Sequence, residues 1–178
     1  EYKKHHINNA IFFDLDNNSK KDTDLPHMLV DADSWEKIVS NMGISINDKI
    51  VIYDNSDVIS SCLCWFNFIY FGHDPRLVHV LNGGLQKWID EKRDVTKDIV
   101  DYPTTDYKVE STNDGIRAFR DEVKKHSDSG LLLIDVRSPK EYSGELLHME
   151  AYPQEGALRG GHIPNAKIVP WATASNED

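Results

Sequence analysis

The stretch KIVIYDNS, residues 49–56, decides the fold. Its first five residues are an apolar, β-branched run of the kind that forms a buried parallel strand. A polar loop follows, and an apolar helix is predicted from about Ser60 to Phe71, with Gly72 at its end. A second β-branched run, LVHVL at residues 77–81, comes next. This order of strand, loop, helix and strand indicates an α/β domain with a largely parallel sheet.

The remaining elements continue the same alternation. A strand is predicted at residues 10–15, a helix at 33–42, a helix from about 85 that carries Trp88, a helix near 115–126 and a strand at 131–135. A polar stretch with little apolar periodicity separates two groups of elements. We therefore predict a first domain at residues 1–92, a linker at 93–114 and the start of a second domain at 115–178.

An internal repeat relates the two predicted domains. Glu1-Tyr2 precedes a His-Ile-x-Asn-Ala block at residues 6–10, and Glu141-Tyr142 precedes the same block at residues 162–166. In the second copy the strand at 131–135 comes before the Glu-Tyr pair, whereas the first copy shows no such strand. We therefore expect a chain cut at both ends, with one nearly complete domain and the start of a second.

Several stretches resemble the tandem rhodanese family of thiosulfate and 3-mercaptopyruvate sulfurtransferases. The similar stretches are HHINNAIFFDLD, TDLPHMLV, KIVIYDNS and FGHDPRLVHVLNGGLQKW in the first copy, and LLLIDVRSPKEYSG and GALRGGHIPNAKIVPW in the second. The resemblance implies a rhodanese-like parallel sheet flanked by helices. It also implies transfer of a sulfane sulfur from thiosulfate or 3-mercaptopyruvate, through a cysteine persulfide, to cyanide or a thiol.

The resemblance places the reactive cysteine first in a loop between a strand and a helix, where backbone amides and the helix N-terminus stabilise a thiolate. In the first copy that position is Asp54, so this copy is expected to be catalytically silent. The family normally carries the cysteine in the second domain. We expect it beyond Asp178, which leaves the parent protein an enzyme and this chain alone inactive.

Cys62 and Cys64 are the two cysteines of the chain. Cys62 lies near the start of the apolar helix, where the helix dipole would favour a thiolate. The alternative, that both thiols pack as small apolar side chains, is favoured, because free cysteine is among the most buried residue types. Their spacing places them on different faces of the helix, which argues against a shared metal or redox pair.

Candidate substrate-binding residues lie in the second copy. The resemblance matches Asp135-Val136-Arg137 to the family's Asp-x-Arg, whose arginine lies near the active site and would bind thiosulfate or carboxylate oxygens. A structural ion pair with Asp135 or Glu141 is an equal alternative. Some family members carry a second arginine where Glu141 stands, and this departure weakens the case. Arg159 is a further anion-binding candidate, with exposure to solvent as its default.

Composition excludes several classes of function. The net charge is −10, with 30 acidic and 20 basic side chains, and no basic cluster suggests nucleic-acid binding. No apolar run is long enough to span a membrane. His5, His6 and the other histidines show no metal-ligand spacing, and His6 and His162 are expected to fix loops by hydrogen bonding. No cofactor is expected, and two close cysteines suit a reducing, cytoplasmic compartment.

Two other interpretations stay open. An inactive rhodanese-like binding or regulatory module would use Asp54 and exposed strand edges to pair with another chain. A phosphatase-like relative would need a longer loop that opens with a cysteine; Asp54 stands in place of that cysteine in the first copy, and the second copy leaves this interpretation open. The strand at 131–134 is further predicted to pair with a neighbouring chain, or to occupy the position of the first copy's absent strand.

Overall fold

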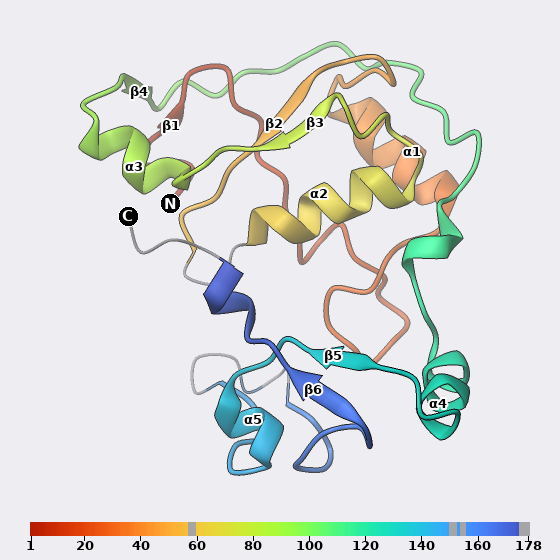
Figure 1. The fold of residues 1–178 in the computed structure, drawn as a ribbon. Coiled ribbons are helices and arrows are strands. Elements are labelled where there is room, and N and C mark those ends of the chain that lie inside the picture. The colour runs from red at the N-terminus through yellow and green to blue at the C-terminus, as the bar shows by residue number, and fades with distance from the viewer. Residues whose placement is uncertain (57–59, 150–152, 154–155, 175–178) are drawn as a thin grey trace. The chain divides into compact units, whose positions relative to one another are not determined.

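The computed structural model describes residues 1–56, 60–149, 153 and 156–174, which form two compact units (Figure 1). The first unit is Glu1–Ile116 and the second is Arg117–Asp178. Residues 93–114, which the sequence suggested as a linker, therefore lie within the first unit. Each unit is described by itself.

A parallel strand pair forms the centre of the first unit. β2 (Ile50–Ile52) pairs with β3 (Val78–Val80) in the register Val51 to His79. The connection between them is α2 (Ser60–Tyr70), which contacts both strands. This unit confirms the strand, helix and strand predicted from residues 49–81. α3 (Gly84–Asp90) follows β3 and buries Leu85.

Aromatic side chains pack the core between α1 (Ala32–Asn41) and α2. Trp35 of α1 stacks on Phe71, with ring centroids 4.8 Å apart, and meets the edge of Phe68 at 5.1 Å. All three rings are almost completely buried, so they contribute much of the hydrophobic stabilisation of this unit. The Asp31 carboxylate accepts a hydrogen bond from the Ser34 amide (2.8 Å) and so begins α1.

The prediction of a strand at residues 10–15 is wrong, because these residues form no strand. A strand requires a partner for its backbone groups. In the first unit, no strand among the described residues pairs with this segment. A short antiparallel pair forms elsewhere, between β1 (His6–Ile7) and β4 (Val95–Thr96).

The segment that follows β4 packs against α1 in an extended conformation. Thr105 N donates to Ser40 O (3.0 Å), Tyr107 N donates to Ser40 Oγ (3.0 Å), and the Tyr107 side chain is fully buried. Val109 N then donates to the Glu36 carboxylate (2.8 Å). Every second residue of this segment, namely Thr105, Tyr107 and Val109, therefore contacts α1, and these contacts anchor the segment to the first unit.

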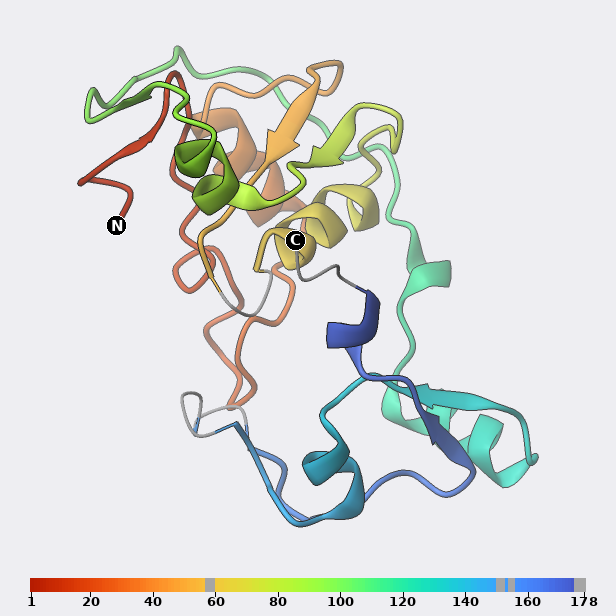
Figure 2. The same ribbon diagram turned by 60° about the vertical axis from the view of Figure 1, so that its left-hand side comes forward.

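The second unit also has a parallel strand pair, β5 (Leu133–Asp135) with β6 (Ala166–Ile168), which lie side by side in Figure 2. Its helices are α4 (Arg120–Asp128) and α5 (Pro139–Ser143). A 3-10 turn at Asp114–Ile116 precedes α4, so the helix expected near 115–126 begins later than predicted. Short 3-10 turns also occupy Trp171–Ala174. The strand predicted at residues 131–135 finds its partner within its own unit, and pairing with another chain stays a prediction.

Candidate functional site

Asp54 lies in the loop between β2 and α2, at the position expected for a nucleophile. Its Oδ2 accepts hydrogen bonds from the Ser61 amide (2.8 Å) and from the Ser56 hydroxyl (3.0 Å). Its carbonyl oxygen accepts from the Leu85 amide (2.9 Å), which joins the loop to α3. A negative charge thus already lies at the N-terminus of α2, where the helix dipole and free amides favour an anion.

Neither cysteine of α2 is in an activating environment. Cys64 is buried, and burial raises the pKa of its thiol to about 12. Partial burial raises the pKa of the Cys62 thiol, and the negative charge of Asp54 raises it further. Cys62 is exposed, which corrects the expectation that both thiols pack inside. Both thiols are therefore neutral near pH 7 and poor nucleophiles.

Asp135 and Arg137, two of the predicted substrate-binding residues, meet at the end of β5. Arg137 Nε donates to Asp135 Oδ1 (3.0 Å) and Nη2 donates to Oδ2 (2.7 Å), which is a two-point ion pair. Nη2 also donates to the Gly161 carbonyl (2.8 Å). Hydrogen bonds from Arg137 lower the pKa of the Asp135 carboxyl below its ordinary value.

The side chain of Arg137 keeps a third of its surface open to solvent, whereas Asp135 is nearly buried. Among the described residues, no group accepts a hydrogen bond from Arg137 Nη1. The guanidinium is therefore held along one edge by Asp135 and Gly161 and retains donors on the other. The arrangement contains the ion pair that was expected as one alternative, and anion binding by Arg137 stays a prediction.

Glu141, which stands where some family members have an arginine, has a local structural role. Its Oε2 accepts from the Ser138 amide (3.2 Å) and hydroxyl (2.7 Å), and the Ser138 hydroxyl accepts from the Glu141 amide (3.3 Å). This reciprocal arrangement is a capping box that begins α5, with Pro139 in the first turn. Its hydrogen-bonding capacity is thus used to fix the turn after Arg137.

Arg159 lies on an exposed bend before Gly161. Within the part of the chain that the structure describes, no hydrogen bond or ion pair joins Arg159 to Asp135 or Arg137. The connection is indirect, because Arg137 binds the Gly161 carbonyl two residues further on. The structure therefore brings together two of the three candidates and leaves the third on the surface.

The two His-Ile-x-Asn-Ala blocks adopt the same local structure. In the second copy, His162 Nδ1 donates to the Tyr142 carbonyl (2.9 Å), and the Tyr142 hydroxyl donates to the Ala166 carbonyl (2.8 Å). In the first copy, Tyr2, His6 and Ala10 make the equivalent contacts, both at 2.8 Å. The fourth residue of each block, Asn9 or Asn165, has a positive φ, which asparagine tolerates. The histidines therefore fix loops, and the tyrosines are participants that the sequence analysis missed.

Among the described residues, no group of three or more His, Cys, Asp or Glu side chains could hold a metal ion. Likewise, no helix within the described ranges is long and apolar enough to cross a membrane.

These features define a parallel α/β protein with an arginine–aspartate ion pair at the end of a strand and a duplicated tyrosine–histidine loop. The rhodanese-like domain family matches residues 1–91. The chain belongs to this family, which confirms the predicted rhodanese-like fold of parallel strands flanked by helices.

Similar proteins extend the match beyond the first unit. The sulfur carrier protein TtuD of Thermus thermophilus is 44% identical over 154 residues, which cover 84% of this chain and 53% of that protein. A protein of Haloferax volcanii, provisionally named a thiosulfate sulfurtransferase, is 38% identical over 178 residues, covering 99% of this chain and 60% of the relative. The crystal structure of SseA from Escherichia coli, described among 3-mercaptopyruvate sulfotransferases, superposes with a TM-score of 0.84 at 25% identity, over 99% of this chain and 63% of that chain. The chain thus spans between half and two thirds of these relatives' length.

Proposed function

We propose that this chain is part of a sulfurtransferase that moves a sulfane sulfur from thiosulfate or 3-mercaptopyruvate to cyanide or a thiol. The reactive cysteine lies outside residues 1–178. Relatives of this chain carry sulfurtransferase names. The observation that carries the proposal is Asp54: its carboxylate occupies the loop position of the nucleophile and already binds the amide of Ser61. The first unit therefore has a structural role.

The proposed reaction balances without a cofactor. A cysteine thiolate attacks the outer sulfur of thiosulfate, the sulfur–sulfur bond breaks, and sulfite leaves with the bonding electrons. Cyanide then attacks the terminal sulfur of the persulfide, thiocyanate forms, and the thiolate returns. A nearby cation and backbone N–H groups would stabilise each anion in this reaction: the thiolate, thiosulfate, sulfite and the persulfide. The thiol pKa values of Cys62 and Cys64 are raised instead, by partial burial and the charge of Asp54 for Cys62 and by burial for Cys64.

Arg137 is the proposed contact of the anionic donor. Asp135 and Gly161 hold its Nε and Nη2, so the guanidinium is oriented before a ligand arrives. The Nη1 donors remain for a sulfonate or carboxylate oxygen. Asp135 is a positioning residue, and Arg159 would supply a second positive charge from the exposed bend. We also assign the protein to a reducing, cytoplasmic compartment on its cysteine content.

The test compares two preparations in a thiosulfate-to-cyanide assay, with intact mass measured on each. The 20.4 kDa chain is expected to be inactive, and a longer protein that contains it is expected to form thiocyanate. A persulfide mapped by mass spectrometry to a cysteine outside these residues completes the expected result. Activity of the 20.4 kDa chain that disappears in a Cys62→Ser variant would overturn the proposal, with Cys64→Ser as the matched control.

The second candidate function is a catalytically inactive binding module. Its support is the acidic residue at the nucleophile position together with the unpaired edge of β5, since β5 pairs with a strand along one side only within the described residues. The two functions differ in one result. A longer protein that binds another protein chain but never forms a persulfide when thiosulfate is added would favour the binding module.

A further inference from the structure

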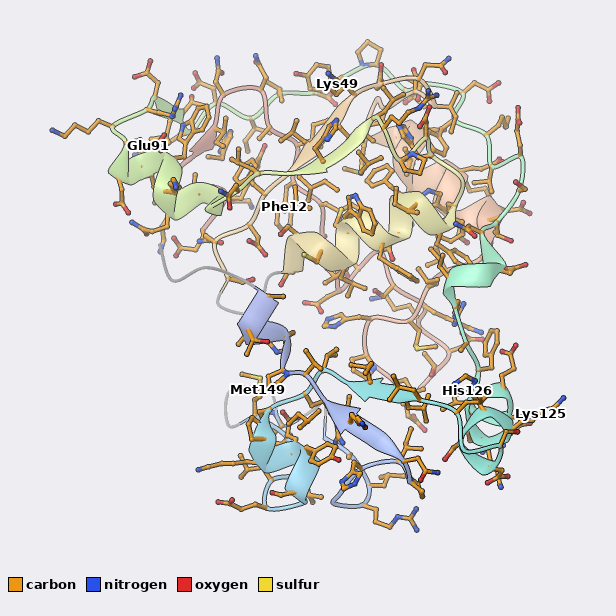
Figure 3. All side chains as sticks on the ribbon, in the orientation of Figure 1. Phe12, Lys49, Glu91, Lys125, His126 and Met149 are labelled. Atoms are coloured by element: carbon orange, nitrogen blue, oxygen red, sulfur yellow. The ribbon has the colours of Figure 1, made fainter. Side chains whose placement is uncertain are left out.

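Three glycines bring two backbone segments of the second unit into direct contact, at the end of α5 and before β6. Gly144 ends α5 with φ +86°, a left-handed conformation that glycine adopts readily. A Cβ atom on Gly144 would lie 2.7 Å from the Gly161 nitrogen, and one on Gly160 would lie 2.9 Å from the Gly144 carbonyl oxygen. These neighbours are backbone atoms, so no side-chain movement could make room. We call this contact the glycine clasp; residues 145–159, which include Met149 labelled in Figure 3, separate its two segments in the sequence.

The glycine clasp includes the residue whose carbonyl group holds Arg137. The Gly161 nitrogen lies against Gly144, and the Gly161 carbonyl oxygen accepts a hydrogen bond from Arg137 Nη2 at 2.8 Å. Because both groups belong to one residue, any displacement of Gly161 by a larger residue at position 144 would also displace the acceptor of Arg137. The end of α5 is therefore linked to the position of the guanidinium.

The first copy of the repeat shows that the tyrosine–histidine loop does not need these glycines. There only Lys3, Lys4 and His5 lie between the tyrosine and the histidine, so no glycine separates them. The ring stack of Tyr2 on His6 and both hydrogen bonds of the loop still form. The glycines of the second copy therefore have a purpose other than the conformation of this loop.

A second Asp-x-Arg pair, in the first unit, shows what the Gly161 carbonyl adds. Arg76 Nε donates to Asp74 Oδ1 (3.0 Å) and its Nη2 donates to Oδ2 (2.6 Å), which is the same two-point geometry as in the pair of Arg137 with Asp135. Among the described residues, no carbonyl group accepts a hydrogen bond from the Arg76 side chain. Its side chain is 88% exposed, against 34% for Arg137. The local sequence is thus sufficient for the ion pair, and the bond to Gly161 is the additional restraint on Arg137.

We propose that the glycine clasp, formed by Gly144, Gly160 and Gly161, positions Arg137 for the anionic sulfur donor. The inference rests on the proposed function, in which Arg137 contacts that donor. Asp135 binds one N–H group on Nε and one on Nη2, and the Gly161 carbonyl binds the second N–H group of Nη2. The two N–H groups of Nη1 are therefore oriented before the donor binds, so less conformational entropy is lost on binding.

The test measures rotation of the Arg137 guanidinium about its Nε–Cζ bond, by nitrogen-15 NMR of the 178-residue chain. Rotation must break the bond to Gly161, so we expect it to be at least about fivefold slower for Arg137 than for Arg76. Gly144→Ala and Gly160→Ala are each expected to bring the rate of Arg137 to that of Arg76.

Gly130→Ala is the matched control for backbone strain. Gly130 also has a positive φ (+70°), but no atom lies within 4 Å of an added Cβ, so the rotation rate of Arg137 is expected to stay unchanged. Gly160→Ala separates the two effects from the other side, because φ of Gly160 is not positive and its added Cβ contacts only the clasp. If Gly144→Ala does not fold, Gly160→Ala decides the test.

Thiosulfate is then titrated into each sample, and the Arg137 Nε–H signal is followed. We expect binding to the parent chain and a dissociation constant at least about threefold higher in Gly144→Ala and Gly160→Ala. The rotation rate needs no ligand and no catalysis, so the two measurements separate the clasp from the proposed function.

Two results would overturn the proposal. If Gly144→Ala and Gly160→Ala leave the rotation rate of Arg137 at the rate in Gly130→Ala, the clasp does not restrain Arg137. If rotation becomes faster but thiosulfate binds these variants as tightly as the parent chain, the restraint does not serve the donor. A parent chain whose Arg137 signal never responds to thiosulfate would instead contradict the donor contact in the proposed function, whatever the rotation rates are.

Discussion

The phenol ring of Tyr142 lies flat on the imidazole ring of His162, with centroids 3.8 Å apart and planes at 6°. Tyr2 and His6 repeat the stack in the first unit at 4.0 Å and 18°. The two pairs differ in sequence spacing, since three residues separate Tyr2 from His6 and nineteen separate Tyr142 from His162. The same contacts form across very different loop lengths. The ring stack and its two hydrogen bonds therefore fix the conformation of this loop, and the number of residues between the tyrosine and the histidine does not.

Tyr142→Phe is expected to keep the stack and to remove the hydrogen bond from the hydroxyl to the Ala166 carbonyl. Loss of a partly buried hydrogen bond costs about 1 kcal/mol. We therefore expect the amides of β6 to exchange about fivefold faster, as measured by hydrogen exchange at Lys167. Tyr102→Phe, in the first unit, is the matched control and should leave Lys167 unchanged. An unaltered rate in Tyr142→Phe would show that the stack alone holds the loop.

Tyr107→Phe tests the anchoring of residues 93–114 to the first unit. His73 Nε2 faces the Asp48 carbonyl at 2.9 Å, so in a neutral ring Nδ1 is the acceptor of the Tyr107 hydroxyl at 3.1 Å. Both side chains are buried, and burial raises the pKa of Tyr107 to about 12. Removal of the hydroxyl leaves Nδ1 unpaired in the core.

The expected cost of Tyr107→Phe is about 1–3 kcal/mol in the free energy of unfolding. Urea unfolding followed by tryptophan fluorescence measures it, since Trp35 reports on the same core. The exposed Tyr102→Phe is expected to change this free energy by less than about 0.5 kcal/mol. Equal stability of Tyr107→Phe and the parent chain would mean that residues 93–114 do not support the core.

The sequence was sufficient to predict the elements whose own residues are amphipathic, as in α1, strongly apolar, as in α2, or β-branched, as in β2 and β3. The segment at residues 10–15 has the same apolar character but forms no strand, because strand formation depends on a partner that local sequence does not encode. Tyr107 was missed for a related reason. A period of two over five residues is a weak signal until the helix that it packs against is known.

The candidate site divides in the same way. Asp135-x-Arg137 was found through the family resemblance, but the sequence could not decide between an ion pair and an anion contact. The structure shows the ion pair together with free donors on Nη1. Tyr2 and Tyr142 had a usable signal, namely the Glu-Tyr pair before each His-Ile-x-Asn-Ala block. The stacking of each tyrosine ring on its histidine ring depends on the loop conformation, which the sequence spacing between the two residues does not predict.

Arg137→Gln is expected to raise the pKa of Asp135 toward its ordinary value of 3.8, because hydrogen bonds from Arg137 are the main cause of its lowering. A lowered folded-state pKa stabilises the fold above pH 3.8, and this contribution is lost as the pH falls through the folded-state value. The parent should therefore lose stability below pH 3.8, and Arg137→Gln should lose less there. At neutral pH the loss is expected to be about 1 kcal/mol at most, since Arg137 is one third exposed.

Carboxyl titration of Asp135 by NMR measures this shift. Arg137→Lys is the informative control: an ammonium keeps the charge but cannot make the two-point contact. An intermediate pKa is expected. If Arg137→Gln titrates like the parent, the backbone amide of residue 137, which also donates to Asp135 (3.0 Å), dominates instead.

Asp54→Asn and Asp54→Ala separate the charge of the loop from its hydrogen bonds. Asparagine keeps an oxygen for the Ser61 amide, whereas alanine removes it and should cost about 1 kcal/mol, as the loss of a helix N-cap does. Both changes remove the negative charge that raises the pKa of Cys62. A lower pKa gives more thiolate at a fixed pH, so alkylation of Cys62 by iodoacetamide at pH 8 should become faster in both variants. The measurement is made in a Cys64→Ser background, so that one thiol reports. Unchanged alkylation in Asp54→Asn would show that partial burial is enough to keep the Cys62 thiol unreactive, and that Asp54 acts on this loop through its hydrogen bonds.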